Sequence, residues 1–76
     1  MNKKWMKNLI SFAERGEVGE CPYCDSDDTA YNATRNNGNI GYAVLWCNHC
    51  KRAFVISRLE ITDVMNNSQE IPKGLH

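Results

Sequence analysis

The sequence predicts a small α+β domain in which an amphipathic helix precedes a three-stranded antiparallel sheet. Three observations lead to this fold class. All four cysteines fall into two Cys-x-x-Cys pairs, Cys21/Cys24 and Cys47/Cys50. An Asn-Gly turn lies midway between the pairs, where two strands would meet in a hairpin. Apolar residues before the first pair recur at helical spacing. We expect one domain over residues 1–65 and a flexible tail over residues 66–76, which lack any period.

Residues 3–15 have the pattern of a helix that ends before Gly16. Gly16 is a natural stop because glycine accepts the left-handed conformation that ends many helices. Polar residues, Asn8 among them, are expected to fill the solvated surface. One apolar stripe faces the other way, made of Trp5, Met6, Leu9, Ile10, Phe12 and Ala13. Small domains rarely leave such a stripe exposed, so we expect it to cover the sheet. The alternative is a docking face anchored by Trp5.

Three strands are expected after the first cysteine pair. Residues 29–35 and 40–46 flank the turn at 36–39, and residues 51–56 follow the second pair. In the second strand Gly41, Ala43 and Leu45 share the face on which a helix can approach closely. Residues 57–64 alternate weakly and either continue the strand or form a short helix. Two strands of about seven residues joined by a tight turn explain how the pairs come together.

The cysteine pairs predict a metal site. Each pair can present two thiolates on one tight turn, and two turns can form a tetrahedral four-sulfur site suited to zinc. A chain of 76 residues buries little surface, so a staple of this kind is expected. Disulfides or iron are the alternatives. The chain starts with a Lys-rich amphipathic segment rather than an apolar leader, so we expect the reducing cytoplasm, where disulfides are rare.

The expected metal is one structural Zn²⁺, with Cys21, Cys24, Cys47 and Cys50 as its ligands. Four thiolates leave no open coordination position, so the ion cannot activate water or bind a substrate. His49 lies inside the second pair and is expected on the surface. No nucleophile–base set is visible, so we expect no enzymatic activity and no small-molecule substrate. No apolar run approaches the ~20 residues of a membrane span.

The order of these features resembles the zinc-ribbon family. Residues 18–58 contain Cys-Pro-Tyr-Cys, a hairpin, Cys-Asn-His-Cys and a third strand. The family includes ribbons of transcription factors and polymerase subunits and small uncharacterised bacterial and phage proteins. The resemblance implies that the four cysteines stand on the family's ligand positions. Family members often carry glycine directly after each pair, whereas this chain has Asp25 and Lys51.

The expected function is that of a binding module. Nine basic and nine acidic residues give zero net charge, which argues mildly against a general nucleic-acid binder. Mixed charge, the Trp5 stripe and Trp46 favour a protein-interaction adaptor. A nucleic-acid or transcription-associated ribbon is the alternative, with Lys51, Arg52, Arg58, His49 and Arg35 as candidate contacts and Tyr23, Tyr31 and Tyr42 as candidate exposed aromatics. Against it, the Asp25-Asp27-Asp28 loop should lie near Lys51 and Arg52 and cancel their field. A rubredoxin-like electron carrier is a third hypothesis.

Overall fold

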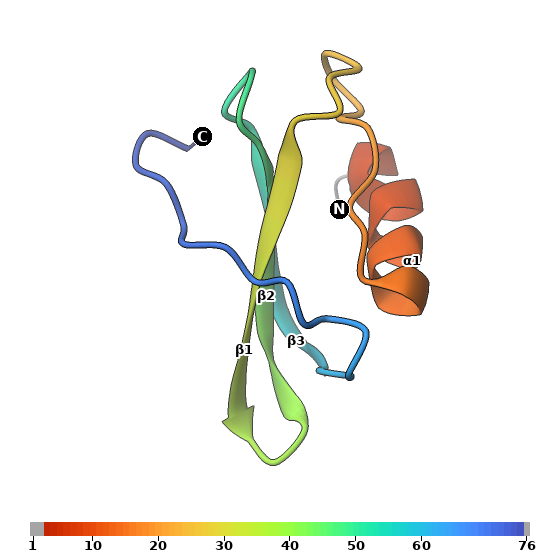
Figure 1. Ribbon diagram of the computed structural model, residues 1–76, viewed down its shortest axis with the longest axis vertical. Coiled ribbons are helices and arrows are strands. Elements are labelled where there is room, and N and C mark those ends of the chain that lie inside the picture. Colours follow the sequence, from red (N-terminus) through yellow and green to blue (C-terminus); the bar gives the residue numbers. More distant parts are fainter. Residues whose placement is uncertain (1–2, 76) are drawn as a thin grey trace.

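One helix covers one face of a three-stranded antiparallel sheet (Figure 1). The computed structural model describes residues 3–75; Met1, Asn2 and His76, at the ends of the predicted domain and tail, lie outside it. A short 3₁₀ turn η1 (Lys3–Trp5) leads into α1 (Met6–Arg15). The strands are β1 (Thr29–Asn37), β2 (Ile40–Cys47) and β3 (Ala53–Glu60), in the spatial order β1-β2-β3. Within residues 3–75 no helix has the length and apolar character needed to cross a bilayer.

The helix ends where the sequence predicts. Gly16 adopts a left-handed conformation with φ 69°, and its N–H donates to the Phe12 carbonyl at 2.8 Å. A side chain at Gly16 would also overlap the backbone carbonyl of Val64. Glycine is therefore required here both by the backbone angle and by the close approach of a distant segment.

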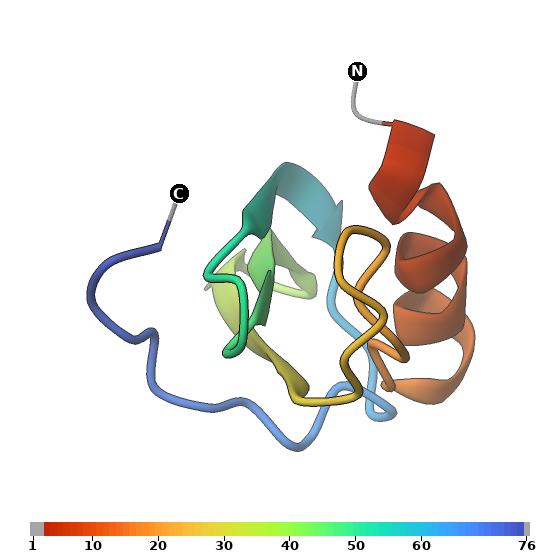
Figure 2. The same ribbon diagram turned by 90° about the horizontal axis from the view of Figure 1, so that it is seen from above.

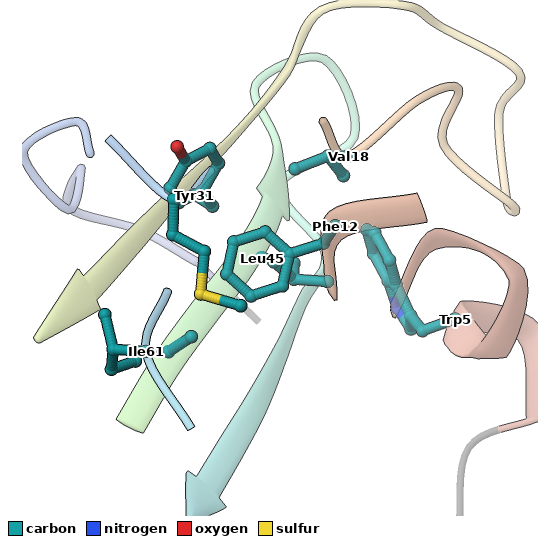
Figure 3. Packing of buried hydrophobic residues seen from close by; sticks show 8 residues of the cluster. Trp5, Phe12, Val18, Tyr31, Leu45 and Ile61 are labelled. Carbon is teal, nitrogen blue, oxygen red and sulfur yellow. The ribbon is translucent and has the colours of Figure 1, made fainter. Parts of the chain in front are cut away.

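The apolar stripe of the helix is divided between core and surface. Trp5 and Phe12 are fully buried, whereas Met6 is 47% and Ile10 54% exposed. The buried cluster comprises Trp5, Phe12, Val18, Tyr31, Ala43, Leu45, Ile61 and Met65. The Phe12 side chain points from α1 toward Leu45, which lies in the middle of this cluster (Figure 3). Trp5 is thus a core residue, and the alternative of a docking face anchored by it is wrong.

The sheet follows the predicted hairpin with longer strands. Only Gly38 and Asn39 separate β1 from β2, and Gly38 has φ 62°. Residues 57–60 continue β3, so the strand is the correct alternative there. Ala43 and Leu45 face the helix, as expected. The expectation that Tyr31 is exposed is wrong, because its ring packs on Phe12 with 4.7 Å between centroids.

The C-terminal segment lies along the outer edge of β1. The Gln69 N–H donates to the Tyr31 carbonyl at 2.8 Å, and the Ala33 N–H donates to Ser68 Oγ at 2.9 Å. The Asn67 N–H donates to the Tyr31 hydroxyl at 2.7 Å. In Figure 2 the segment passes the β1 edge and turns toward the sheet face opposite α1. Flexibility of residues 66–76 stays a prediction, but part of this segment has defined partners on the sheet.

Candidate metal centre

The two cysteine turns meet at one end of the sheet. β2 runs directly into the second turn at Cys47, while the first turn precedes β1. Thr29 at the start of β1 is paired with Cys47 at the end of β2. Beyond that pair, the Asn48 N–H donates to the Asp28 carbonyl at 2.8 Å. The hairpin register therefore places the two turns side by side, which is the role the sequence predicts for it.

The two turns have the same backbone structure. In the first, the Asp25 N–H donates to the Cys21 carbonyl at 3.0 Å, and the Cys21 N–H donates to the Ser26 carbonyl at 2.8 Å. In the second, the corresponding bonds join Lys51 to Cys47 and Cys47 to Arg52, both at 3.0 Å. Two Cys-x-x-Cys segments with different intervening residues thus form the same turn, and each contributes two sulfurs to one cluster.

The residue after each turn adopts the left-handed conformation. Asp25 has φ 61° and Lys51 has φ 66°. Glycine adopts this region freely, whereas both positions here carry a side chain. An L-residue with a side chain is disfavoured in this region, asparagine and aspartate less than others. Both residues therefore adopt this conformation at a cost in free energy, and the cost is larger for Lys51 than for Asp25.

The four predicted ligands form a single cluster. The four Sγ atoms all lie within 4.8 Å of one another. Cys21 and Cys50 are 3.5 Å apart and Cys24 and Cys47 are 3.6 Å apart, and all four cysteines are free. A tetrahedral ion with metal–sulfur bonds of ~2.3 Å would space its sulfurs about 3.8 Å apart. The cysteines are therefore positioned to bind one metal ion.

The neighbouring thiols influence the protonation of Cys24. Cys21 and Cys47 are buried, Cys50 is half-buried and Cys24 is exposed. A hydrogen bond from the Ser26 backbone lowers the pKa of Cys24, but desolvation and the neighbouring thiols outweigh it and raise the pKa to about 12. Crowded thiols hold their protons because adjacent thiolates repel. A bound cation removes that repulsion, so metal binding and proton release are linked.

Asn8 anchors the first cysteine turn to the helix. Its Nδ2 donates to the Val18 carbonyl at 2.7 Å and to the Glu20 carbonyl at 2.6 Å, directly before Cys21. The side chain is only 7% exposed, so the prediction that Asn8 lies on the solvated surface is wrong. The residue type could have indicated this contact, because asparagine is unfavourable in a helix interior and often forms hydrogen bonds with nearby backbone groups.

Two basic side chains beside the cluster lie over one aromatic ring. Arg52 lies over the Tyr23 ring at 4.3 Å from its centroid, and Lys4 lies over the same ring at 5.0 Å. Within residues 3–75 no ion pair joins the Asp25-Asp27-Asp28 loop to Lys51 or Arg52. His49 is exposed, as expected, and is not part of the sulfur cluster.

A scan of protein-family models and searches of curated proteins and of solved structures find no match for this chain. The assignment of a metal site therefore depends on the cysteine geometry, and the zinc-ribbon family remains a resemblance.

Proposed function

We propose that the chain is a zinc-ribbon protein of the cytoplasm in which one Zn²⁺ has a structural, non-catalytic role. The four-sulfur cluster formed by two equivalent turns is the observation that supports this. Zinc is the usual ion of closed Cys₄ sites, and such sites contribute directly to folding. With all four positions filled by sulfur, the ion is unavailable to a substrate.

The proposed biological role is that of a protein-interaction adaptor. With Trp5 in the core, the candidate contact surface consists of the apolar side chains that stay exposed. Met6 and Ile10 are neighbours on the outer side of α1 and form this surface. Val55 is 62% exposed on β3, but it lies on the sheet face away from the helix and is a separate contact. Lys7 and Glu14 are exposed on α1 three and four residues from Ile10, so charges of both signs flank this apolar pair. Such a surface suits a protein partner better than a phosphate backbone.

Nucleic-acid binding is the second candidate. The convergence of Lys4 and Arg52 on Tyr23 favours it, because it places two cations and an aromatic ring beside the cysteine turns. Zero net charge and the nearby acidic loop weaken the field that would attract phosphate. We therefore rank this role below the adaptor.

The metal proposal is tested by elemental analysis of purified wild-type, Cys47→Ser and His49→Ala proteins. We expect the wild-type protein to be colourless and to contain about one zinc ion per chain. His49→Ala should give the same result, because it changes an exposed residue of the same turn that is not a ligand. Cys47→Ser should lose both the metal and the sheet. A red, iron-containing protein, or a Cys47→Ser protein that folds without metal, would contradict the proposal.

The functional proposal is tested by two titrations. Single- and double-stranded DNA and RNA are titrated at ~50 mM salt, where even non-specific contacts are strong. A protein partner captured by cross-linking is then purified and titrated with wild-type and Met6→Glu/Ile10→Glu proteins. Saturable binding of a purified protein supports the adaptor. Binding of nucleic acid alone would favour the second candidate and refute the first.

A further inference from the structure

The two edges of the sheet differ in their surroundings. The strand order β1-β2-β3 leaves β1 and β3 at the rims. The outer edge of β1 is covered by the chain's own C-terminal segment, through Ser68 and Gln69. In Figure 2, β3 lies at the other rim of the sheet, away from this covered edge. Within residues 3–75 no second strand pairs with β3 on its outer side.

Register shows which groups of β3 are available. The Cys47 N–H donates to the Arg52 carbonyl, so alternate residues from Arg52 onward direct their backbone toward β2. Ala53 and Val55 therefore direct their N–H and C=O groups away from the sheet. Within residues 3–75 these groups form no hydrogen bond with another segment. An unpaired strand edge of this kind is a template for an added strand.

The charge along this edge indicates the chemistry of an added strand. Lys51, Arg52 and Arg58 are basic, and Glu60 is the one acidic residue between 51 and 60. A second copy paired along the same edge would bring like charges together, which is destabilising across strands. An acidic segment would meet complementary charge. The exposed Val55 side chain provides an apolar contact beside it.

We propose that the β3 edge binds an extended acidic segment of a partner protein, which adds a fourth strand to the sheet. The inference rests on the adaptor function proposed above and gives its partner a chemical class. Backbone groups of the segment pair with Ala53 and Val55, while its carboxylates lie near Arg58. The C-terminal segment on β1 shows that this sheet already accepts an extended chain at its other edge.

The probe is a fluorescein-labelled seven-residue peptide of alternating Glu and Val, titrated into the zinc-loaded chain by anisotropy. Binding should slow hydrogen exchange at the Ala53 and Val55 amides, followed by NMR. Two control peptides separate the contributions. One carries Lys in place of Glu and should bind at least about threefold more weakly. The other has N-methylated alternate amides, which removes its backbone donors, and should bind about tenfold more weakly.

Variants of β3 test the position. Val55→Pro removes an outward N–H without removing a bond to β2, and proline is tolerated on edge strands. It should weaken peptide binding about tenfold, whereas Val55→Thr, which keeps the N–H, should bind nearly as wild type. Arg58→Glu should weaken binding about threefold. Lys73→Glu makes the same charge change in the C-terminal segment and should have no effect, which keeps the test valid even if Val55→Pro fails to fold.

Several outcomes would overturn the inference. The first is that the bound peptide protects amides outside β3. The second is that Arg58→Glu and Lys73→Glu bind the peptide equally well. The third is that the chain dimerises with rising concentration and that this protects the Ala53 and Val55 amides. If no peptide binds but a purified partner does so through Met6 and Ile10, the edge inference fails while the adaptor function stands. If neither peptide nor protein binds and nucleic acid does, the adaptor function itself fails.

Discussion

Asn8 connects the helix to the first cysteine turn with two hydrogen bonds from one side-chain nitrogen. Asn8→Ala leaves the carbonyls of Val18 and Glu20 without these donors and should cost about 1–3 kcal/mol of unfolding free energy. Asn8→Asp should cost more, because it places a carboxylate against two carbonyl oxygens. Chemical denaturation of the zinc-loaded proteins measures both effects. Equal stability of wild type and Asn8→Asp would contradict the anchoring role.

The left-handed backbone conformation of Lys51 is unfavourable, and a single substitution should remove this cost in free energy. Its φ of 66° is disfavoured for a residue with a side chain, and glycine adopts it freely. Lys51→Gly should therefore stabilise the protein by up to about 1 kcal/mol, after the greater chain entropy of glycine is deducted. Asp25→Gly is the matched comparison and should gain less, because aspartate tolerates this conformation better. Thermal unfolding of the zinc-loaded variants measures the difference, and a destabilised Lys51→Gly would show that the lysine side chain has a role of its own.

At the level of elements, the C-terminal segment protects the β1 edge. Ser68 accepts a hydrogen bond from the Ala33 N–H, and Tyr31 receives two more contacts from the same segment. Ser68→Ala should speed hydrogen exchange of the Ala33 amide, since its acceptor is removed. Ser57→Ala, at an exposed position on β3, is the control and should leave that amide unchanged. Unchanged exchange in Ser68→Ala would mean that this contact is not formed in solution.

Sequence patterns were sufficient where one local rule decided the structure. Gly16, the Asn-Gly turn and the alternation of Ala43 and Leu45 each predicted an element boundary or a face correctly. Asn8 was misplaced because a polar residue on a helix is assigned to solvent, and its two acceptors come from a segment whose path no local pattern gives. The contacts of residues 67–69 were missed for a similar reason, since a single short run of edge pairing produces no periodicity.

For the whole molecule, metal removal should abolish the folded sheet. Structural zinc sites contribute ~10–16 kcal/mol of apparent binding free energy, comparable to or larger than the ~5–15 kcal/mol stability of a typical domain. Adding a chelator under reducing conditions should therefore eliminate the cooperative thermal transition, and added zinc should restore it. A chain that keeps this transition with chelator present and its thiols reduced would show that the core cluster suffices alone.

Metal binding should also depend on pH in a defined direction. Because the crowded thiols raise the pKa of Cys24 to about 12, its thiol carries a proton at neutral pH and must release it to bind the ion. Apparent zinc affinity should therefore rise between about pH 6 and about pH 8, with protons released into a weak buffer. Competition with a chelating dye measures the affinity, and a pH-independent affinity would contradict thiolate ligation.

The two tryptophans occupy positions that make them separate optical reporters. Trp46 directly precedes a metal ligand, and its indole N–H donates to Asn48 Oδ1 within the second turn at 3.0 Å. Trp5 lies in the core between helix and sheet. Trp46→Phe would leave emission that follows docking of the helix, and Trp5→Phe would leave emission that follows loading of the sulfur cluster. The order in which the ion and the helix reach their places during refolding can thus be timed by intrinsic fluorescence, without an added dye.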